Sequence, residues 1–567
     1  MPNTLSSAMS STCKVPEPIG SLMDDDILED LQLDLGPRLG ADGSPRTSNP
    51  SKLSLQFSDK SLCRGVGVTK VLRRFGKLFN GSAGTVEDYQ LGQEVHKVSA
   101  FITHNWSLNR WKKCMALCCY FHIVPAFVVS VVVQLFFFVL VLADKLPLMR
   151  ADYRDVDGID LAHSREFHVG CWCMVGGWLA FWLTLFLWAD VAAMFGRSGP
   201  IVFVDKVCID QVSIDRKAQG ILAIPAWLAC SDTLVAVFSD ELLVKLWTCF
   251  ELCTFVILGK TDKIRVEPAL LSYASFFVSI YLVVIVIWNQ LQTLGDSTNK
   301  ELELALGIEF TVTVAILGYS GLFLLIFAVL AHWGRVCHRI HKQVHELDIR
   351  TANCFDEADR ALVVQALQSL GDRHIFHRKD SEDQQVDELA IAELTVAIRS
   401  QLENAIVRSL GFNRLPFKYL VASLLPLLGD MLDYFAADVR HQQLVASQRE
   451  PETIADTLRQ VATSFLLRVS QPLLAISLFC LGALVPVILL PNCPHKWTRR
   501  LHLTGLVLSL FLWFLAIFAY ALVGYIRLQE VVSDLNWVLL AAADVIAVGW
   551  LYFLYGPVQL KRVRSGS

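Results

Sequence analysis

Charged side chains are scarce in this sequence. Asp, Glu, Lys and Arg make up 18% of its 567 residues, whereas hydrophobic residues make up 54% and the mean hydropathy is +0.45. Soluble globular domains carry roughly 25% charged residues, so this composition argues against an ordinary soluble protein. The formal net charge of −4 is too small to predict attraction to a nucleic acid, and we expect no such partner.

The sequence also lacks a disulfide framework and a secretory leader. Its 15 cysteines are an odd number without regular spacing, and several lie within apolar runs. This pattern favours reduced thiols in lipid or cytosol. The first residues show no basic segment followed by an apolar run and a cleavage site, so we expect no signal peptide.

Long apolar runs dominate the sequence instead. An α-helix needs about 20 apolar residues to cross the hydrocarbon core of a bilayer. Tyr419–Gly429 is too short because Asp430 and Asp433 interrupt it. We interpret it as an interfacial or re-entrant helix, with an eighth span as the alternative. Seven runs reach the required length: Cys118–Leu142, Val169–Ala189, Ala269–Trp288, Phe310–Ala331, Pro472–Leu490, Leu503–Ile526 and Leu535–Pro557.

The basic residues between the spans predict the orientation, because cytoplasmic loops of membrane proteins are enriched in Lys and Arg. Arg197 to Arg265, between the second and third spans, contains eight basic residues. Four more precede the first span: Lys70, Arg73, Arg74 and Lys77. We therefore expect the N-terminus and residues 190–268 in the cytosol. The rule does not decide the side of the C-terminal half, and nothing in the sequence identifies the membrane.

Three short runs between the spans have the pattern of buried β-strands. Val98–Thr103, Ile201–Asp205 and Thr233–Ser239 are apolar on both faces and rich in β-branched residues, as in a parallel sheet. Helical stretches separate them, and the first one runs into the first span. The predicted fold is an α-helical multi-pass bundle with a small cytosolic α/β domain, which a transmembrane hairpin interrupts after the first strand and helix.

These patterns divide the chain into ten segments. The N-terminal part contains a disordered tail (1–66), a basic lead-in (67–95), the first strand and helix of the α/β domain (96–117), a transmembrane hairpin (118–189), the rest of the α/β domain (190–268) and a second transmembrane hairpin (269–331). The C-terminal part contains a cytosolic helical region (332–411), an amphipathic or re-entrant region (412–471), three transmembrane helices (472–557) and a basic tail (558–567).

Polar residues follow each predicted strand. His104, Asn105 and Trp106 follow the first strand, Asp205 ends the second and Ser239 ends the third. Binding sites of open α/β sheets form at the carboxyl ends of the strands. We therefore expect these side chains to meet at one edge of the sheet.

The helix after the third strand carries Trp247 and Glu251. Residues four apart lie on the same face of a helix, so the sequence pairs an aromatic ring with a carboxylate near the same edge. The ordered set of motifs resembles the Toll/interleukin-1 receptor (TIR) domain over about 90 residues, 96–112 plus 197–268. The matching positions are Ala100–Trp106 with Arg110, Val202–Asp205, Gly220-Ile221, Ser231–Ser239, and Trp247 with Glu251-Leu252. The run Asp205–Gln211 is also similar to the related heterokaryon-incompatibility (HET) domain.

The resemblance implies signalling through self-association, or hydrolysis of NAD at its nicotinamide–ribose bond. NAD would then be a substrate, and no cofactor or metal is expected. The resemblance assigns catalysis to Glu251, and we expect Trp247 to stack on the base. One carboxylate suffices because nicotinamide leaves from a cationic nitrogen, so no general acid is needed. The remaining expected substrate-binding residues are Asp205, His104, Asn105, Trp106 and Ser239.

Two other classes of function stay open. In a non-catalytic scaffold, Trp247 and Glu251 would only shape an interaction surface. In a channel or transporter regulated by the α/β domain, Asp544 in the seventh span would line a path with His122 and Gln134 from the first. A further cluster on one helix (Cys337, His338, His341 and His345) is interpreted as a polar face next to the membrane rather than as a metal site.

Overall fold

The computed structural model describes residues 55–81, 83–152, 166–239, 241–292, 310–354, 357–374, 388–410, 416–446 and 545. Apart from Val545, the three C-terminal predicted spans lie outside these residues. So do Asp544, the basic tail and most of the predicted N-terminal tail.

A six-stranded mixed sheet forms the core of the α/β layer, in the order β2-β1-β6-β3-β7-β8. The three predicted strands are adjacent and parallel in it, with β3 between β6 and β7. The edge strand β8 is also parallel, whereas β1 pairs antiparallel with β6 and β2 antiparallel with β1. The bounds are β1 Arg64–Gly67, β2 Gln93–Glu94, β3 Val98–His104, β6 Ile201–Phe203, β7 Ser231–Phe238 and β8 Ile264–Pro268.

Aromatic packing against the central strands fixes the sheet. Phe101 of β3 and Phe203 of β6 stack with ring centroids 4.4 Å apart. Trp227 packs against Phe203 at 4.7 Å, and its indole N–H donates to the carbonyl oxygen of Arg64 on β1. All three rings are fully buried.

The predicted disordered tail, residues 1–66, ends too late, because β1 begins at Arg64. Val66 is completely buried, and Gly67 lies so close to the chain before β6 that a Cβ atom would come 2.5 Å from the carbonyl oxygen of Ser198. A strand of two glycines and one apolar residue carries almost no sequence signal for a strand.

Short helices connect and cover the strands. The helical stretch between β6 and β7 consists of two helices, because the chain turns at Ala223 and Pro225 lies in the first turn of the second, where its missing N–H is not needed. The helices are α2 Val68–Gly76, α3 Val86–Gln90, α4 Arg110–Phe121, α7 Asp205–Cys208, α8 Ile214–Leu222, α9 Ile224–Cys230 and α10 Leu246–Ile257.

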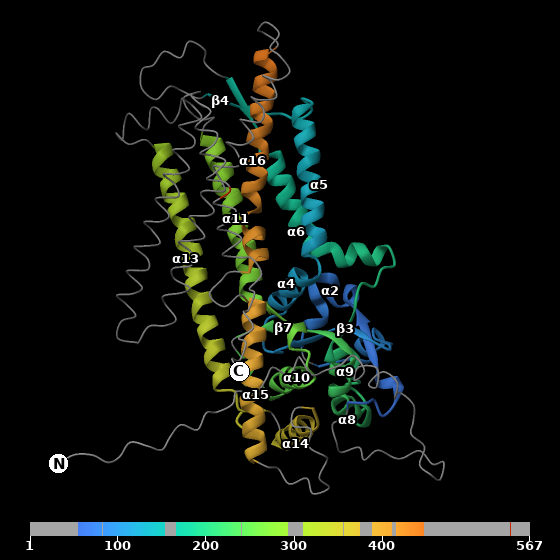
Figure 1. Cartoon of the computed structure of the whole chain (residues 1–567). Helices are drawn as coiled ribbons and strands as arrows, with labels where there is room; N and C mark the ends of the chain where they lie inside the picture. Colours follow the sequence, from blue (N-terminus) through green and yellow to red (C-terminus); the bar gives the residue numbers. More distant parts are fainter. Residues whose placement is uncertain are drawn as a thin grey trace, which may run out of the picture.

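Among the described residues, five helices are long and apolar enough to cross a membrane. They are α5 Ile123–Leu142, α6 Trp172–Met194, α11 Ala269–Gln292, α13 Phe310–His345 and α16 Phe417–Ala446. Figure 1 shows them side by side on one side of the α/β layer. A small antiparallel pair, β4 Met149–Asp152 and β5 Glu166–Val169, lies between α5 and α6 in the sequence.

The chain enters this bundle from the sheet twice. It leaves β3 through α4, passes along α5 and α6, and returns to the sheet at β6. It leaves β8 at Pro268, and α11 begins at the next residue, Ala269. At this second crossing no residue separates the strand from the helix.

The helix expected at Tyr419–Gly429 is longer than predicted, as the alternative of an eighth span requires. The helix α16 continues through Asp430 and Asp433 for 30 residues. Asp433 is almost fully buried, and its two carboxylate oxygens accept the backbone N–H groups of Cys173 and Met174, each at 2.9 Å. These N–H groups lie in the first turn of α6 and have no partner within that helix, so the acid caps a neighbouring helix.

A glycine allows α16 and α6 to approach closely. A Cβ atom on Gly429 would lie 2.4 Å from the Cα of Met174. Small residues at such crossings are typical of helix pairs in membranes.

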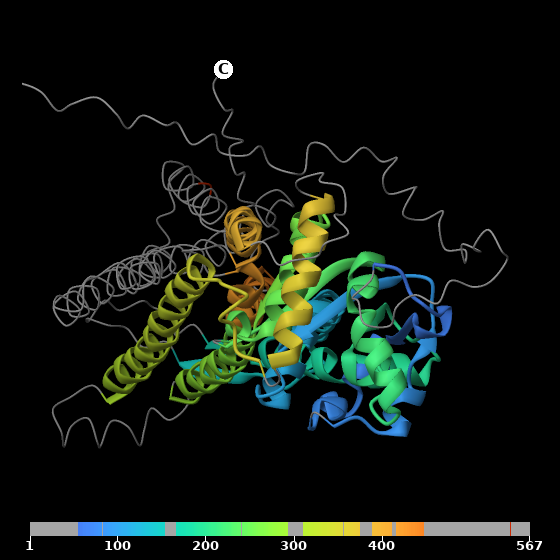
Figure 2. The ribbon, with the colours of Figure 1, turned by 90° about the horizontal axis from the view of Figure 1, so that it is seen from below.

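Two helices complete the layer opposite the bundle: α14 Glu357–His374 and α15 Glu388–Leu410. Figure 2, which looks at the molecule from below, shows α14 crossing the layer between α13 on one side and the N-terminal elements on the other. The side chains of α15 reach β8: the Ser409 hydroxyl accepts the Val266 backbone N–H.

Candidate functional site

The order of the four parallel strands locates the candidate site. The chain passes from β3 to β6 on one side and later from β7 to β8 on the other. The connections therefore diverge between the carboxyl ends of β3 and β7, which is where doubly wound sheets bind their ligands. His104 ends β3, and Ser239 follows β7.

Asn105 connects these two strand ends. Its side-chain amide donates to the Glu241 carboxylate at 2.9 Å, and the hydroxyl of Ser107 donates to the same carboxylate oxygen at 3.2 Å. Glu241 was not predicted from the sequence, because it lies in a short loop without a motif. It meets Asn105 only because β3 and β7 are neighbours in the sheet.

Trp106 connects β3 to β6. Its indole N–H donates to a carboxylate oxygen of Asp205 at 2.8 Å, and the other oxygen accepts the backbone N–H of Lys206 at 2.7 Å. The structure thus brings together three of the expected residues, Asn105, Trp106 and Asp205, as a polar network along the carboxyl edge of the sheet.

Lys113 lies behind this network and was also missed by the sequence interpretation. It is fully buried on α4, a helix that the Asn109 side chain caps. Its Nζ donates to the carbonyl oxygen of Trp106 at 3.1 Å and lies 4.6 Å from the centroid of the Trp106 ring. Burial lowers the pKa of Lys113 to about 8, although nearby Asp205 acts in the opposite direction.

His104 is held in an aromatic environment. Its ring lies edge-on to Trp106 at 4.5 Å and to Phe79 at 5.4 Å. Burial lowers the pKa of His104 to about 4, and the opposing effect of Asp205 is smaller. At neutral pH its imidazole is therefore uncharged.

Two buried polar atoms at this edge have no hydrogen-bond partner, His104 Nε2 and Ser239 Oγ, and a third, Thr103 Oγ1, faces the Glu251 carboxyl group. They lie at the ends of β3 and β7, beside the point where the connections diverge. Buried polar atoms without partners are rare in folded proteins. Such atoms are available to a polar ligand that binds at this edge.

Glu251 lies close to this group on α10. The residue keeps partial contact with solvent, yet protein atoms surround its carboxyl group closely enough that burial raises its pKa to about 8. The Thr103 hydroxyl partly offsets this effect, and the negative charge of Asp205 adds to it. Most Glu251 side chains are therefore protonated at pH 7.

Trp247 does not contact the strand-end residues. Its indole N–H donates to Asp359 of α14 at 3.1 Å, and its ring packs edge-on against Phe250 at 5.8 Å. Stacking on a base at the strand ends would require Trp247 to leave α14. The sequence predicted Trp247 and Glu251 on one face of a helix. It could not predict that α14 packs against Trp247.

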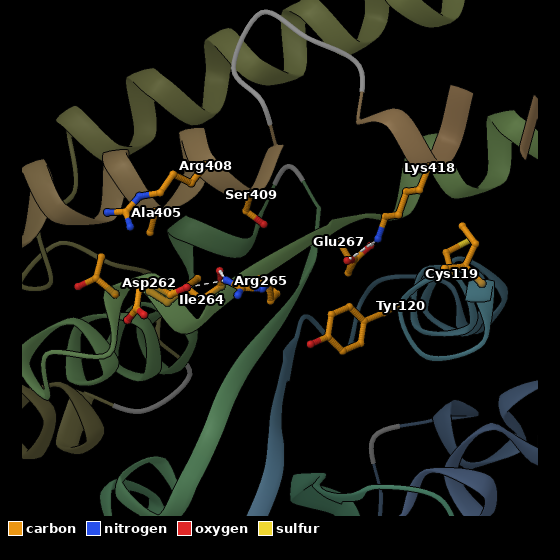
Figure 3. A pocket seen from close by; sticks show the side chains of 12 residues that line it. Cys119, Tyr120, Asp262, Ile264, Arg265, Glu267, Ala405, Arg408, Ser409 and Lys418 are labelled. Atoms are coloured by element: carbon orange, nitrogen blue, oxygen red, sulfur yellow. Dashed lines mark hydrogen bonds and ion pairs between the residues drawn. The ribbon is translucent and has the colours of Figure 1, made fainter. Parts of the chain in front are cut away.

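A pocket of about 560 Å³ lies elsewhere, along the edge strand β8 and between α4, α15 and α16. Figure 3 shows Lys418 of α16 pointing at Glu267 of β8, while Arg408 of α15 lies at the opposite end above Asp262. Lys418 Nζ is 2.6 Å from a Glu267 carboxylate oxygen, and the Tyr419 hydroxyl donates to the other oxygen at 2.8 Å. None of the twelve residues that line the pocket belongs to the strand-end group.

Comparison with known protein families, with curated proteins and with solved structures finds no match to this chain.

Proposed function

We propose that this chain is a multi-pass membrane protein that presents a TIR-like α/β layer to the cytosol, signals through self-association and hydrolyses NAD. Five membrane-length helices and the basic residues between the second and third predicted spans support the placement. The order of the parallel strands, β6-β3-β7-β8, is that of flavodoxin-like doubly wound sheets, which bind nucleotide-type ligands at the same position.

The observation that carries the proposal is the set of unpartnered polar atoms beside Glu251. Ser239 offers a hydroxyl group and neutral His104 offers a ring nitrogen, and the Thr103 hydroxyl lies beside Glu251. These groups suit the hydroxyl-rich ribose of a nucleotide. Glu251 supplies the carboxyl group that the reaction needs at the ribose carbon.

The raised pKa of Glu251 fits a cationic substrate. The positive charge of the nicotinamide ring favours the ionised carboxylate when NAD binds. The bond between ribose C1′ and the nicotinamide nitrogen then breaks, and both of its electrons leave with neutral nicotinamide. The Glu251 carboxylate stabilises the positive charge that develops on the ribose. Water bonds to C1′ and releases a proton, so the products are ADP-ribose, nicotinamide and H⁺.

Nicotinamide release by the full-length, detergent-solubilised protein tests this proposal. We expect Glu251→Gln to lower kcat by about 100-fold or more, the size of loss typical when one electrostatic group is removed. Glu87→Gln is the matched control, because Glu87 is exposed on α3 and should leave turnover unchanged. We expect wild-type activity to rise towards pH 8 as the Glu251 carboxyl group ionises.

Absence of turnover in wild-type protein that is folded and self-associated would overturn the enzymatic proposal. Full activity in Glu251→Gln would do the same. The hydrogen bond from Trp247 to Asp359 favours the second candidate, a non-catalytic scaffold. It holds against α14 the ring that is expected to stack on the base. In a scaffold, Glu251→Gln would leave self-association intact and NAD would not bind.

The channel alternative now depends on Asp544, which lies outside the described residues. His122 Nδ1 lies 3.2 Å from the Leu185 carbonyl oxygen of α6. Gln134 bonds to Ser130, which itself donates to the Gly177 carbonyl oxygen. These bonds hold α5 against α6, so both predicted path residues take part in helix packing.

A further inference from the structure

Two histidines and one glutamate converge where α13 meets α15. His341 and His345 are one turn apart near the end of α13, and Glu403 faces them from α15. The His341 Nδ1 atom is 3.0 Å from Glu403 Oε1, and His345 Nε2 is 3.8 Å from Glu403 Oε2. The two imidazole rings are nearly perpendicular, with centroids 4.3 Å apart.

The spacing of these three donors matches a metal site. The donor atoms of the three side chains lie within 4.8 Å of one another. Four ligands at zinc's usual bond lengths place neighbouring donor atoms about 3.4 Å apart in a tetrahedron. The two measured separations lie on either side of that value, so small rotations of the side chains would complete the geometry.

The chemistry of the donors indicates which ion fits. Imidazole nitrogen with one carboxylate is a ligand set that Zn²⁺ accepts, with water at the fourth position. The nearby cation Lys342 forms an ion pair with Glu346 along α13. All three donor side chains keep contact with solvent, so an ion can enter and leave.

We infer that His341, His345 and Glu403 bind a divalent transition-metal ion, for which Zn²⁺ is the best fit. The site is independent of the proposed NAD chemistry. The sequence revealed the two histidines, but it grouped them with Cys337 and His338. Cys337 is buried and His338 is exposed on the same helix, and neither belongs to the converging set.

The ion would join a membrane-length helix to the α/β layer. Arg399 of α15 already donates to the Leu347 carbonyl oxygen just beyond α13, at 2.7 Å and 3.0 Å. On the same helix, Gln401 accepts a hydrogen bond from Thr261, three residues before β8. Metal binding would therefore fix the end of α13 relative to the edge of the sheet.

Metal binding by the full-length protein in detergent tests the inference. After chelator treatment and addition of Zn²⁺ or Co²⁺, we expect one ion per chain at the site. Glu403→Gln and His345→Ala should weaken binding by at least about tenfold, whereas His338→Ala should leave it unchanged. The Co²⁺ spectrum should lack thiolate charge-transfer bands, which separates this site from binding by the many cysteines.

Three outcomes would overturn the inference. They are failure of the wild-type protein to retain either ion, equal affinity in wild type and both ligand variants, and loss of binding in Cys337→Ser with a thiolate spectrum in wild type. Circular dichroism of each variant verifies folding. Glu403→Gln keeps the shape of the side chain, so it serves if His345→Ala does not fold. A rise in Tm on adding Zn²⁺, seen in wild type and His338→Ala but not in Glu403→Gln, would support a metal ion that joins α13 to α15.

Discussion

The side-chain amide of Asn105 donates a 2.9 Å hydrogen bond to the carboxylate of Glu241, and this bond joins the loops after β3 and β7. The two loops border the point where the connections of the parallel strands diverge. Their relative position therefore decides the width of the candidate site.

Replacing Asn105 should loosen this junction. Asn105 is buried, while Glu241 is exposed, so solvent screens part of the interaction and Asn105→Ala should cost about 1 kcal/mol of stability. Asn105→Asp should cost more, because it places two carboxyl groups together. Thermal unfolding in detergent measures both, and Asn80→Asp at an exposed position is the control. An Asn105→Asp variant as stable as wild type would show that the loops are held by other contacts.

Glu251 should make the stability depend on pH. Its folded-state pKa of about 8 exceeds the ordinary value of 4.5, so the folded state keeps a proton that the unfolded chain releases. This stabilisation is fully present below pH 4.5 and is lost as the pH rises to about 8. Each pKa unit corresponds to about 1.4 kcal/mol, which sets an upper limit of a few kcal/mol.

Glu251→Gln removes this dependence because the amide stays neutral. We expect similar Tm values for wild type and variant near pH 5, and a higher Tm for the variant at pH 8.5. Fluorimetric unfolding at both pH values tests this without any assay of activity. The expectation fails if the difference in Tm does not change with pH.

Asp433 should be essential for packing α16 against α6. Asp433→Ala leaves the N–H groups of Cys173 and Met174 without their acceptors in a buried place, and we expect a loss of about 2–4 kcal/mol. Asp433→Asn keeps one acceptor and should lose less. Ser423→Ala on the same helix, where the hydroxyl donates to the Tyr419 carbonyl oxygen, is the control. Equal Tm values for Asp433→Ala and Ser423→Ala would contradict the capping role.

The sequence predicted the elements whose signal is local. The strands β3, β6 and β7 were found because their β-branched residues are apolar on both faces. The strand β8 was missed because Arg265 and Glu267 interrupt its apolar residues. Glu267 is buried there only because Lys418 and Tyr419, from a helix 150 residues later, bind its carboxylate.

The sequence also failed to predict the full length of α16, because the partners of its charged residues are distant in the chain. Two acids interrupt its apolar run, and only the structure shows that Asp433 meets the start of another helix. A charged residue cannot be assigned to a membrane helix until its partner is known.

The candidate site was predictable in part. The rule that ligands bind at strand ends led to His104, Asn105, Trp106, Asp205 and Ser239. It could not find Glu241 and Lys113, whose roles depend on how loops and helices fold together. In the same way, the spacing of His341 and His345 indicated a shared helix face, whereas Glu403 becomes their partner only through packing of α13 on α15.

The hydrogen bond between Cys173 and Asp433 spans 260 positions of the chain, and this separation sets an order of events during synthesis. The first turn of α6 leaves the ribosome long before its cap is translated. Until residue 433 is synthesised, the backbone N–H groups of Cys173 and Met174 lack the acceptors that they have in the folded protein. The hairpin of α5 and α6 can therefore complete its contacts with α16 only after residue 433 has been made.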